Sequence, residues 1–488
     1  MLRKIRIVLA VVFFAAITLL LLDFTGVLHT YLGWMAKVQL LPAVLALNFG
    51  VIAGLLVLTL VLGRVYCSVI CPMGVMQDCF SWLGGKFMKN RFHYTKGHAV
   101  LRIVALVVFV ALMVLGLNAI AILVAPYSAY GRIATTLFQP VYMWVNNMIA
   151  YFCERADTYA FYHVDVWVKS VVVLVVSVVT FVVIGFMSFR WGRLWCNTIC
   201  PVGTVLGFLS KFAWLKPHID DKKCVGCGKC AKNCKSQCIN PETHEIDYSR
   251  CVACMDCMDN CKLGAIKLSG GCGKKQTKAG EEVDTSRRKF VVTTAAVGAA
   301  MAVEAQATKV DGGLAVIEDK QLPERQVPVK PFGAQGLKHF SQHCTACQLC
   351  VAECPEKVLR PSKNLTTMMQ PEMQFDKGYC RPDCTRCSEV CPAGAIKKID
   401  IAEKSAISVG HAVTVPHNCL LSSGEECHAC ERHCPTGAIT IMEGIEGAHN
   451  NVTVNEQLCI GCGACEHYCP VRPFSAIYVE GRETHQTI

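Results

Sequence analysis

Cys344-Thr-Ala-Cys347-Gln-Leu-Cys350-Val-Ala-Glu-Cys354-Pro355 is the stretch around which this chain is organised. Three cysteines at this spacing lie on one tight loop and bind three irons of a cubane 4Fe-4S cluster, and the fourth cysteine binds a neighbouring cluster. A zinc ribbon needs separated Cys-x2-Cys knuckles instead. The stretch therefore predicts an iron–sulfur protein.

The same pattern occurs six times, twice with altered spacing, and uses 24 of the 32 cysteines. The sequence thus predicts six 4Fe-4S clusters and a protein that transfers electrons. The predicted ligands are Cys224, Cys227, Cys230 and Cys234; Cys251, Cys254, Cys257 and Cys261; Cys344, Cys347, Cys350 and Cys354; Cys380, Cys384, Cys387 and Cys391; Cys419, Cys427, Cys430 and Cys434; and Cys459, Cys462, Cys465 and Cys469.

Composition separates a membrane half from the cysteine-rich remainder. Of the 488 residues 53% are hydrophobic, and the apolar residues concentrate in the first 190 or so. A net charge of +11 would suit nucleic acid, but there is no basic stripe with interleaved aromatics, so we predict no nucleic-acid partner. The cysteines follow cluster spacing rather than scattered pairs, which argues against a disulfide framework.

Four apolar stretches are long enough to span a bilayer, which takes roughly 20 helical residues. They cover residues 5–22, 38–62, 99–125 and 166–189. Lysine and arginine accumulate in the loop between the second and third stretches, so both ends of this half are expected in the cytoplasm. The fold predicted for residues 1–215 is a four-span α-helical bundle in a bacterial inner membrane.

A duplicated motif lies at the cytoplasmic ends of the second and fourth stretches. Gly63-Arg-Val-Tyr-Cys67-Ser-Val-Ile-Cys71-Pro matches Gly192-Arg-Leu-Trp-Cys196-Asn-Thr-Ile-Cys200-Pro. If each Cys-x3-Cys occupies one helical turn, its two sulfurs share a face. A reversible disulfide, a soft-metal site or a thiolate pair beside a quinone would fit, and the alternative is a packed turn with proline. Two matching copies favour a redox or metal role for Cys67, Cys71, Cys196 and Cys200.

Two histidines are weaker candidates. His29 and His163 fall near the predicted outer membrane face, where they could serve a quinol site or bind haem. A lone interfacial histidine is more often a packing residue.

Residues 216–268 are expected to form a cytoplasmic two-cluster ferredoxin of small α+β fold. Crossed ligation assigns Cys224, Cys227, Cys230 and Cys261 to one cluster, and Cys251, Cys254, Cys257 and Cys234 to the other. Lys235 and Lys262 replace the usual proline after the fourth cysteine, and their charges should raise the reduction potentials.

Residues 269–307 combine a linker with an export signal. Ser286-Arg287-Arg288-Lys289-Phe290 opens a short apolar run that ends near Ala305-Gln-Ala307. This pattern is typical of a twin-arginine signal, read by the twin-arginine export machinery. The alternative is a linker with a buried helix, and the run could also persist as a fifth span.

Residues 308–488 are then expected to form a periplasmic domain of α+β ferredoxin-like units with four clusters. Crossed ligation could pair adjacent runs, or nest them, first with fourth and second with third, and we favour nesting. No Ser–His–Asp set, phosphate loop or dinucleotide fingerprint is found, so no substrate-transforming site is predicted.

On these motifs, residues 1–268 resemble NapH, a four-span ferredoxin family marked by two Cys-x3-Cys-Pro motifs and two cluster runs. Residues 280–488 resemble the NapG/MauM group of exported ferredoxin-type proteins. The resemblance implies a quinol dehydrogenase module that passes electrons from the quinol pool to a periplasmic reductase or cytochrome. The alternatives are an electron donor or metal-handling factor for the maturation of a metalloenzyme, and a structural scaffold with relict clusters.

Overall fold

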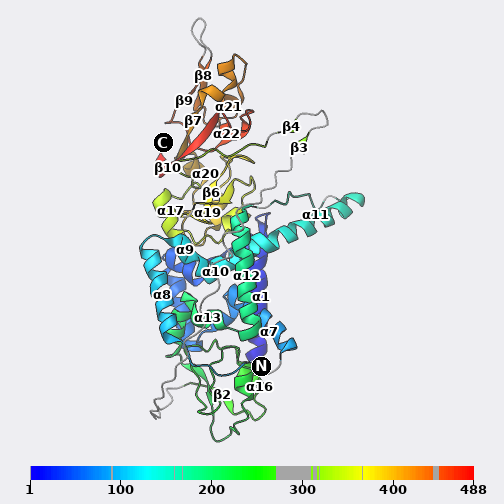
Figure 1. Ribbon diagram of the computed structural model, residues 1–488, viewed down its shortest axis with the longest axis vertical. Helices are drawn as coiled ribbons and strands as arrows, with labels where there is room; N and C mark the ends of the chain where they lie inside the picture. Colours follow the sequence, from blue (N-terminus) through cyan, green and yellow to red (C-terminus); the bar gives the residue numbers. More distant parts are fainter. Residues whose placement is uncertain are drawn as a thin grey trace.

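The computed structural model describes residues 2–88, 92–158, 160–167, 169–270, 309–310, 316–317, 319–364, 366–442 and 450–488. It is an elongated molecule with three tiers (Figure 1). We call them the small cysteine-rich unit (residues 215–270), the helical tier (residues 2–210) and the large cysteine-rich unit (residues 319–488). The predicted twin-arginine segment, residues 286–307, lies outside the described residues.

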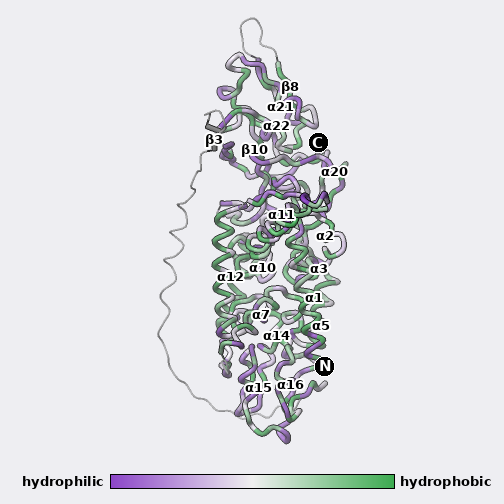
Figure 2. Tube along the Cα trace, turned by 90° about the vertical axis from the view of Figure 1, so that its right-hand side faces the viewer, coloured by the Kyte–Doolittle hydropathy of each residue, from purple (hydrophilic) through white to green (hydrophobic). Residues whose placement is uncertain are grey.

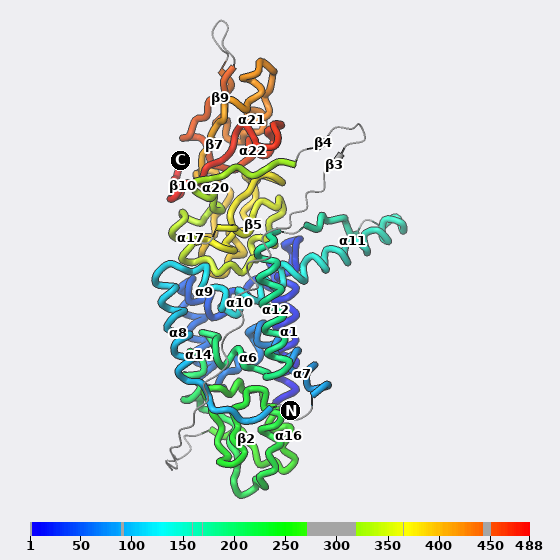
Figure 3. The backbone as a smooth tube through the Cα atoms, viewed as in Figure 1, coloured from blue at the N-terminus to red at the C-terminus, as the bar shows by residue number. Residues whose placement is uncertain are grey.

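The helical tier separates the two cysteine-rich units, which lie at its opposite ends (Figure 3). Its helices are α1 (Leu2–Leu22), α2 (Val27–Leu32), α3 (Trp34–Lys37), α4 (Leu40–Leu45), α5 (Phe49–Leu62), α6 (Val65–Val69), α7 (Pro72–Phe87), α8 (Ala99–Val114), α9 (Asn118–Val124), α10 (Pro126–Ile133), the π-helical η1 (Ala134–Phe138), α11 (Gln139–Arg155), α12 (Val171–Trp191), α13 (Leu194–Thr198) and α14 (Pro201–Ser210). Figure 2 shows that apolar residues predominate in this tier.

Among the described residues, two helices are long and apolar enough to cross a membrane. They are α1 and α12, each of 21 residues. The second and third predicted spans are interrupted. Asn48 begins α5 by accepting a hydrogen bond from the Val51 amide at 3.3 Å, after α4 has ended. Gly116, at φ 77°, separates α8 from α9. The four-span bundle is therefore not confirmed, because polar and glycine positions break two of the apolar runs.

The helices α10, η1 and α11 were not expected from the sequence. α11 occupies the predicted loop between the third and fourth spans and projects sideways from the helical tier (Figure 1). Trp144 and Phe152 on this helix are exposed.

The small cysteine-rich unit is closed by a two-stranded antiparallel sheet. β1 (Leu215–Ile219) pairs with β2 (Ile266–Gly270), with Pro217 opposite Leu268. Between them lie the short helices α15 (Lys229–Lys232) and α16 (Asp256–Asn260). Because the strands are the first and last elements, the unit closes on itself.

The large cysteine-rich unit alternates short helices with two-stranded antiparallel sheets. The sheets pair β5 with β6, β7 with β10, and β8 with β9. Its elements are α17 (Leu337–His343), α18 (Leu349–Ala352), β5 (Leu359–Pro361), β6 (Pro371–Met373), α19 (Arg386–Val390), α20 (Ile401–Ser405), β7 (Ile407–Thr414), η2 (Pro416–Asn418), η3 (Leu420–Ser423), α21 (Ala429–Arg432), β8 (Ile439–Met442), β9 (Asn451–Val454), α22 (Ala464–Tyr468) and β10 (Ile477–Thr487). A further pair, β3 (Lys309–Val310) with β4 (Val316–Ile317), precedes it.

A continuous apolar core joins the tiers. One cluster of buried side chains extends from Val252 and Cys254 of the small unit, through Tyr66 and Tyr130 of the helical tier, to Cys347 of the large unit. The three tiers therefore pack as one body along a shared core.

Candidate metal centres

Two cavities in the half of the large unit next to the helical tier are lined by cysteines. One gathers Cys344, Cys347, Cys350 and Cys391. The other gathers Cys354, Cys380, Cys384 and Cys387. The first and second runs thus exchange their fourth cysteines, because α18 and α19 each carry the chain from one cavity to the other.

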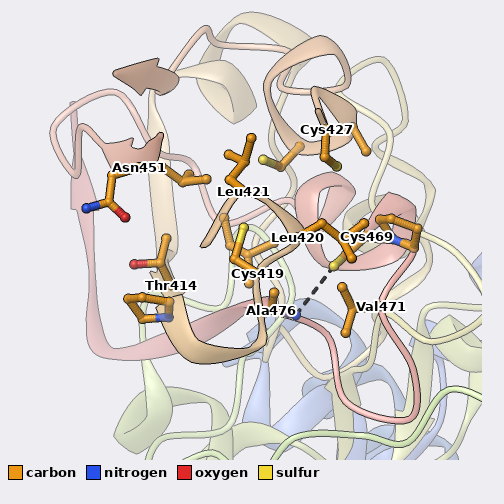
Figure 4. Close-up of a pocket in the computed structure, with 15 residues that line it drawn as sticks. Thr414, Cys419, Leu420, Leu421, Cys427, Asn451, Cys469, Val471 and Ala476 are labelled. Carbon is orange, nitrogen blue, oxygen red and sulfur yellow. Dashed lines mark hydrogen bonds between the residues drawn. The ribbon is translucent and has the colours of Figure 1, made fainter. Parts of the chain in front are cut away.

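The other half of the large unit repeats this arrangement. Cys419, Cys427, Cys430 and Cys469 line one cavity (Figure 4), and Cys434, Cys459, Cys462 and Cys465 line the next. The nested pairing that we favoured is therefore wrong, and adjacent runs pair. The physical reason is local closure, since each pair of runs is held together by its own short sheets and helices.

Another such cavity lies in the small unit. Cys251, Cys254, Cys257 and Cys234 line it, which is the predicted crossed set. Cys238, outside every predicted set, also lines it, with its Sγ 3.6 Å from that of Cys234. The partner set of Cys224, Cys227, Cys230 and Cys261 stays a prediction.

The donor sets fit cubane clusters. Each of the five cavities has four cysteines of two runs on its wall, and each wall is otherwise mainly apolar. Among the described residues, no three His, Cys, Asp or Glu side chains converge closely enough to hold a single metal ion. Thiols that surround a cavity without converging suit a 4Fe-4S cluster, in which each iron takes one thiolate and the cluster carries one electron.

Burial controls the protonation of these thiols when no cluster is bound. Desolvation raises the pKa of Cys430 to about 11 and of Cys462 to about 12. Because thiolates are the ligands, cluster binding must release protons from these groups.

One lysine that the sequence did not single out contacts a predicted ligand. Lys404 of α20 is 2% exposed, and its Nζ lies 3.2 Å from Cys380 Sγ and 2.6 Å from the carbonyl oxygen of Cys384. Burial raises the pKa of Cys380 to about 11 although Lys404 opposes it. A cation held here stabilises the reduced, more negative state of a cluster.

Replacing Lys404 with methionine should therefore lower the reduction potential of this cluster. We expect a fall on the order of 50 mV, a roughly tenfold change in the one-electron equilibrium. Redox titration followed by electron paramagnetic resonance measures it. Lys398→Met, at an exposed lysine of the same unit, is the control, and equal shifts in both variants would contradict the assignment.

The first cavity of the large unit lies directly on the helical tier. A Cβ on Gly131 of α10 would lie 2.4 Å from the carbonyl oxygen of Cys347. Asn118 of α9 donates to the carbonyl oxygens of Ser341 and Gln342, each at 2.8 Å. These contacts leave no room for another element between the first cysteine run and α9–α10.

The small unit is fastened to the other end of the tier by ion pairs around Asp78. Asp78 of α7 accepts from Arg193 Nε at 2.8 Å, and from Arg6 Nη1 and Lys235 Nζ at 3.0 Å each. Lys235 also pairs with Asp256 at 3.0 Å. The predicted effect of Lys235 on a cluster potential is reduced, because two carboxylates compensate its charge.

The duplicated motifs meet inside the helical tier. Cys67, Cys71, Cys196 and Cys200 are each 3–4% exposed. The motif arginines cross over: Arg193 Nη1 donates to the carbonyl oxygen of Cys67 at 2.6 Å, and Arg64 Nη2 to that of Cys196 at 3.2 Å. The four predicted redox or metal residues thus share one buried region.

The two candidate histidines are not brought to the cysteine cavities. His163 Nε2 lies 3.6 Å from Glu154 Oε1, with both side chains exposed. His29 Nε2 is buried in α2 without a hydrogen-bond partner among the described residues.

Comparison with known proteins agrees with the cysteine geometry. A family model described as "4Fe-4S dicluster domain" matches residues 343–395 and 425–472, and one described as "4Fe-4S binding domain" matches residues 44–91 and 172–220. The methylamine utilization ferredoxin-type protein MauM of Methylobacillus flagellatus is 31% identical over 183 residues, 35% of this chain and 75% of the relative. The chain belongs to the MauM and NapG family of ferredoxin-type proteins.

Two further relatives are also ferredoxin-type proteins. The ferredoxin-type protein NapG of Escherichia coli K12 is 30% identical over 38% of this chain and 80% of NapG. NapF of the same strain is 28% identical over 31% of this chain and 85% of NapF. No solved structure matches the chain. This protein of the MauM and NapG family therefore carries 4Fe-4S ferredoxin domains and transfers electrons. The two matches within residues 44–220 each contain one copy of the duplicated motif.

Proposed function

We propose that the chain is a quinol dehydrogenase module that spans a bacterial inner membrane. It takes electrons from the quinol pool and passes them through the large cysteine-rich unit to a periplasmic reductase or cytochrome. Each quinol loses two electrons and two protons. Two clusters accept one electron each, and the protons leave to water.

The observation that carries the proposal is the contact of Gly131 with Cys347. It sets the first cluster site of the large unit against the end of the helical tier, where a quinol in the bilayer could reach it. Ile122 and Val173 of the tier pack there against Ala346 and Met369. A cluster held by Cys344, Cys347, Cys350 and Cys391 is then the natural first acceptor.

The remaining sites of the large unit extend away from this interface. Val351, Cys350 and Cys354 lie in one apolar cluster with residues of the second half. The Cys380 amide donates to the Cys462 carbonyl oxygen at 2.9 Å and so joins the second site to the third. The site of Cys419 and Cys469 follows, and its rim at Leu420 and Val471 suits a partner that accepts electrons.

We propose the following topology. Residues 1–215 form the membrane domain with four spans, two of them interrupted, and residues 216–268 a cytoplasmic ferredoxin. Residues 269–307 form the linker with a twin-arginine signal or fifth span, and residues 308–488 the periplasmic domain. The ion pair of Arg3 with Asp256 at 2.9 Å supports a cytoplasmic N-terminus beside the small unit.

The maturation alternative requires thiols that can hand a metal or electrons to another protein. Burial of the four Cys-x3-Cys-Pro thiols to 3–4% exposure does not favour it. Electron transfer, which needs no exposed ligand, suits such residues better.

The test adds duroquinol to the anaerobically purified full chain and follows cluster reduction by electron paramagnetic resonance. We expect reduction in the unmodified chain and its loss in Cys344→Ser/Cys347→Ser. The control is Cys153→Ser in α11, outside every cluster run. Intact clusters that stay oxidised with excess quinol would refute the proposal, as would undiminished reduction of the other clusters in the double variant.

A further inference from the structure

The four thiols of the duplicated motif are the strongest feature that the proposed electron path leaves unused. Cys67 lies in α6 and Cys196 in α13, while Cys71 and Cys200 each precede the first residue of a longer helix, α7 or α14. Cys67, Cys71 and Cys200 belong to one buried core. All four thiols are nearly inaccessible to water, so reactivity toward solutes does not explain them.

Within each motif copy, the cysteine turn packs closely against the helix that follows it. A Cβ on Gly74 would lie 2.2 Å from the carbonyl oxygen of Cys67, and one on Gly203 would lie 2.2 Å from that of Cys196. Each glycine therefore lets a helix approach the cysteine turn of its own copy. The crossed arginines then hold the two copies together, so the site has approximate two-fold symmetry.

Arg64 marks the site as one for an anion. Its side chain is 0% exposed, and among the described residues it has no carboxylate partner. Its Nη1 donates to Asn197 and its Nη2 lies 3.9 Å from Cys67 Sγ, but its Nε has no partner. A buried charge without a counter-charge is strongly destabilising, as the removal of one member of a buried ion pair shows. The Cys67 thiol, whose Sγ lies 3.9 Å from Nη2, is a group within reach that can carry the negative charge.

The second arginine and two helix ends add to the positive potential. Arg193 is also 0% exposed; its Nε pairs with Asp78, while its Nη2 has no hydrogen-bond partner among the described residues. Cys71 and Cys200 stand at the N-termini of α7 and α14, of 16 and 10 residues, and the Gly203 amide donates to Cys200 Sγ at 3.3 Å. Helix N-termini and buried arginines both favour negative charge.

A single cluster accounts for these observations together. Each segment matched by the 4Fe-4S binding-domain model contributes one Cys-x3-Cys pair, half of what a cubane needs. Four thiolates from both copies complete the set, and the net negative charge of a thiolate-bound cubane supplies the counter-charge that Arg64 lacks. We propose that Cys67, Cys71, Cys196 and Cys200 together bind a seventh 4Fe-4S cluster within the helical tier.

The position of the proposed seventh cluster, next to the small unit, provides it with a partner for electron exchange. Val252 and Cys254 of the small unit belong to the same buried core as Cys67, Cys71 and Cys200, and Arg64 Nη1 also donates to the carbonyl oxygen of Ser249 at 3.1 Å. The seventh cluster therefore exchanges single electrons with the small-unit cluster held by Cys234, Cys251, Cys254 and Cys257.

The experiment measures iron and acid-labile sulfide in the full chain, purified anaerobically in detergent. We expect about 28 irons per chain, four for each of seven cubanes. Cys67→Ser/Cys196→Ser should contain about 24 irons and lack one electron paramagnetic resonance signal. Cys79→Ser, an exposed cysteine of α7, should match the unmodified chain.

About 24 irons in the unmodified chain with its other clusters intact, or a Cys67–Cys196 or Cys71–Cys200 disulfide detected by mass spectrometry, would overturn the proposal. The unmodified count is decisive even if the double variant fails to fold. Because no quinol is added, this result is independent of the proposed dehydrogenase function.

Discussion

Asp78→Asn is expected to destabilise the junction between the small unit and the helical tier by about 3–5 kcal/mol, the typical cost of removing one member of a buried charge pair. The Asp78 carboxylate receives Arg193 on one oxygen, and Arg6 and Lys235 on the other. Asparagine would leave these three cations without their shared counter-charge. Thermal unfolding followed by the visible absorbance of the clusters should show the loss, with release of the small unit by limited proteolysis.

Asp259→Asn provides the matched control. Asp259 also pairs with an arginine, Arg3, at 2.6 Å, but the two side chains are 51% and 40% exposed. Exposed pairs contribute about 0–1 kcal/mol, so this variant should unfold close to the unmodified chain. Equal destabilisation by both substitutions would show that the network around Asp78 does not hold the junction.

The pH dependence of this junction has a definite sign. Burial opposes ionisation of Asp78, but Arg193 and Lys235 outweigh it and hold the pKa of this carboxyl well below its usual range. A depressed carboxyl pKa contributes stability that is present above about pH 4 and is lost as the pH falls further. The difference between the unmodified chain and Asp78→Asn should therefore stay constant from about pH 5 to 8 and shrink only in stronger acid.

Cysteine runs could be located from the sequence, because ligand spacing is a local property. Three cysteines of a run lie on one loop whatever the rest of the chain does, and the first three cysteines of the runs that begin at Cys344 and Cys459 each line a single cavity. Which two cysteine runs pair depends on which short sheets hold them together, and the spacing of the cysteines does not determine those sheets. Nesting was wrong for this reason.

Contacts between residues far apart in the chain could not be predicted from the sequence either. Nothing local to Lys404 indicates that its amine reaches Cys380, because α20 must first fold back on the second run. The apolar content of residues 38–62 predicted one span, but Asn48 interrupts the helix there. Arg64 and Arg193 were visible as repeat positions, yet their crossed bonds appear only when both copies face each other.

Gly131→Ala should slow quinol-driven reduction of the large unit about tenfold while all its clusters stay bound. The added Cβ would meet the carbonyl oxygen of Cys347 at 2.4 Å and its carbonyl carbon at 3.2 Å. Both are backbone atoms on the loop of the first cluster site, so they cannot rotate away, and the unit must lift from α10. Overpacking of this kind costs about 1–3 kcal/mol, and about 1.4 kcal/mol is a tenfold shift in an equilibrium such as docking.

Stopped-flow measurement of cluster bleaching after duroquinol addition, at matched iron content, gives this rate. Gly54→Ala in α5 is the control, because its Cβ would meet nothing within 4 Å and the substitution should leave the rate unchanged. Slower reduction in Gly131→Ala with a normal iron count places electron entry at the α10 interface. An unchanged rate in a variant with normal iron content would mean that electrons reach the large unit by another route, and that the contact of Gly131 with Cys347 serves assembly alone.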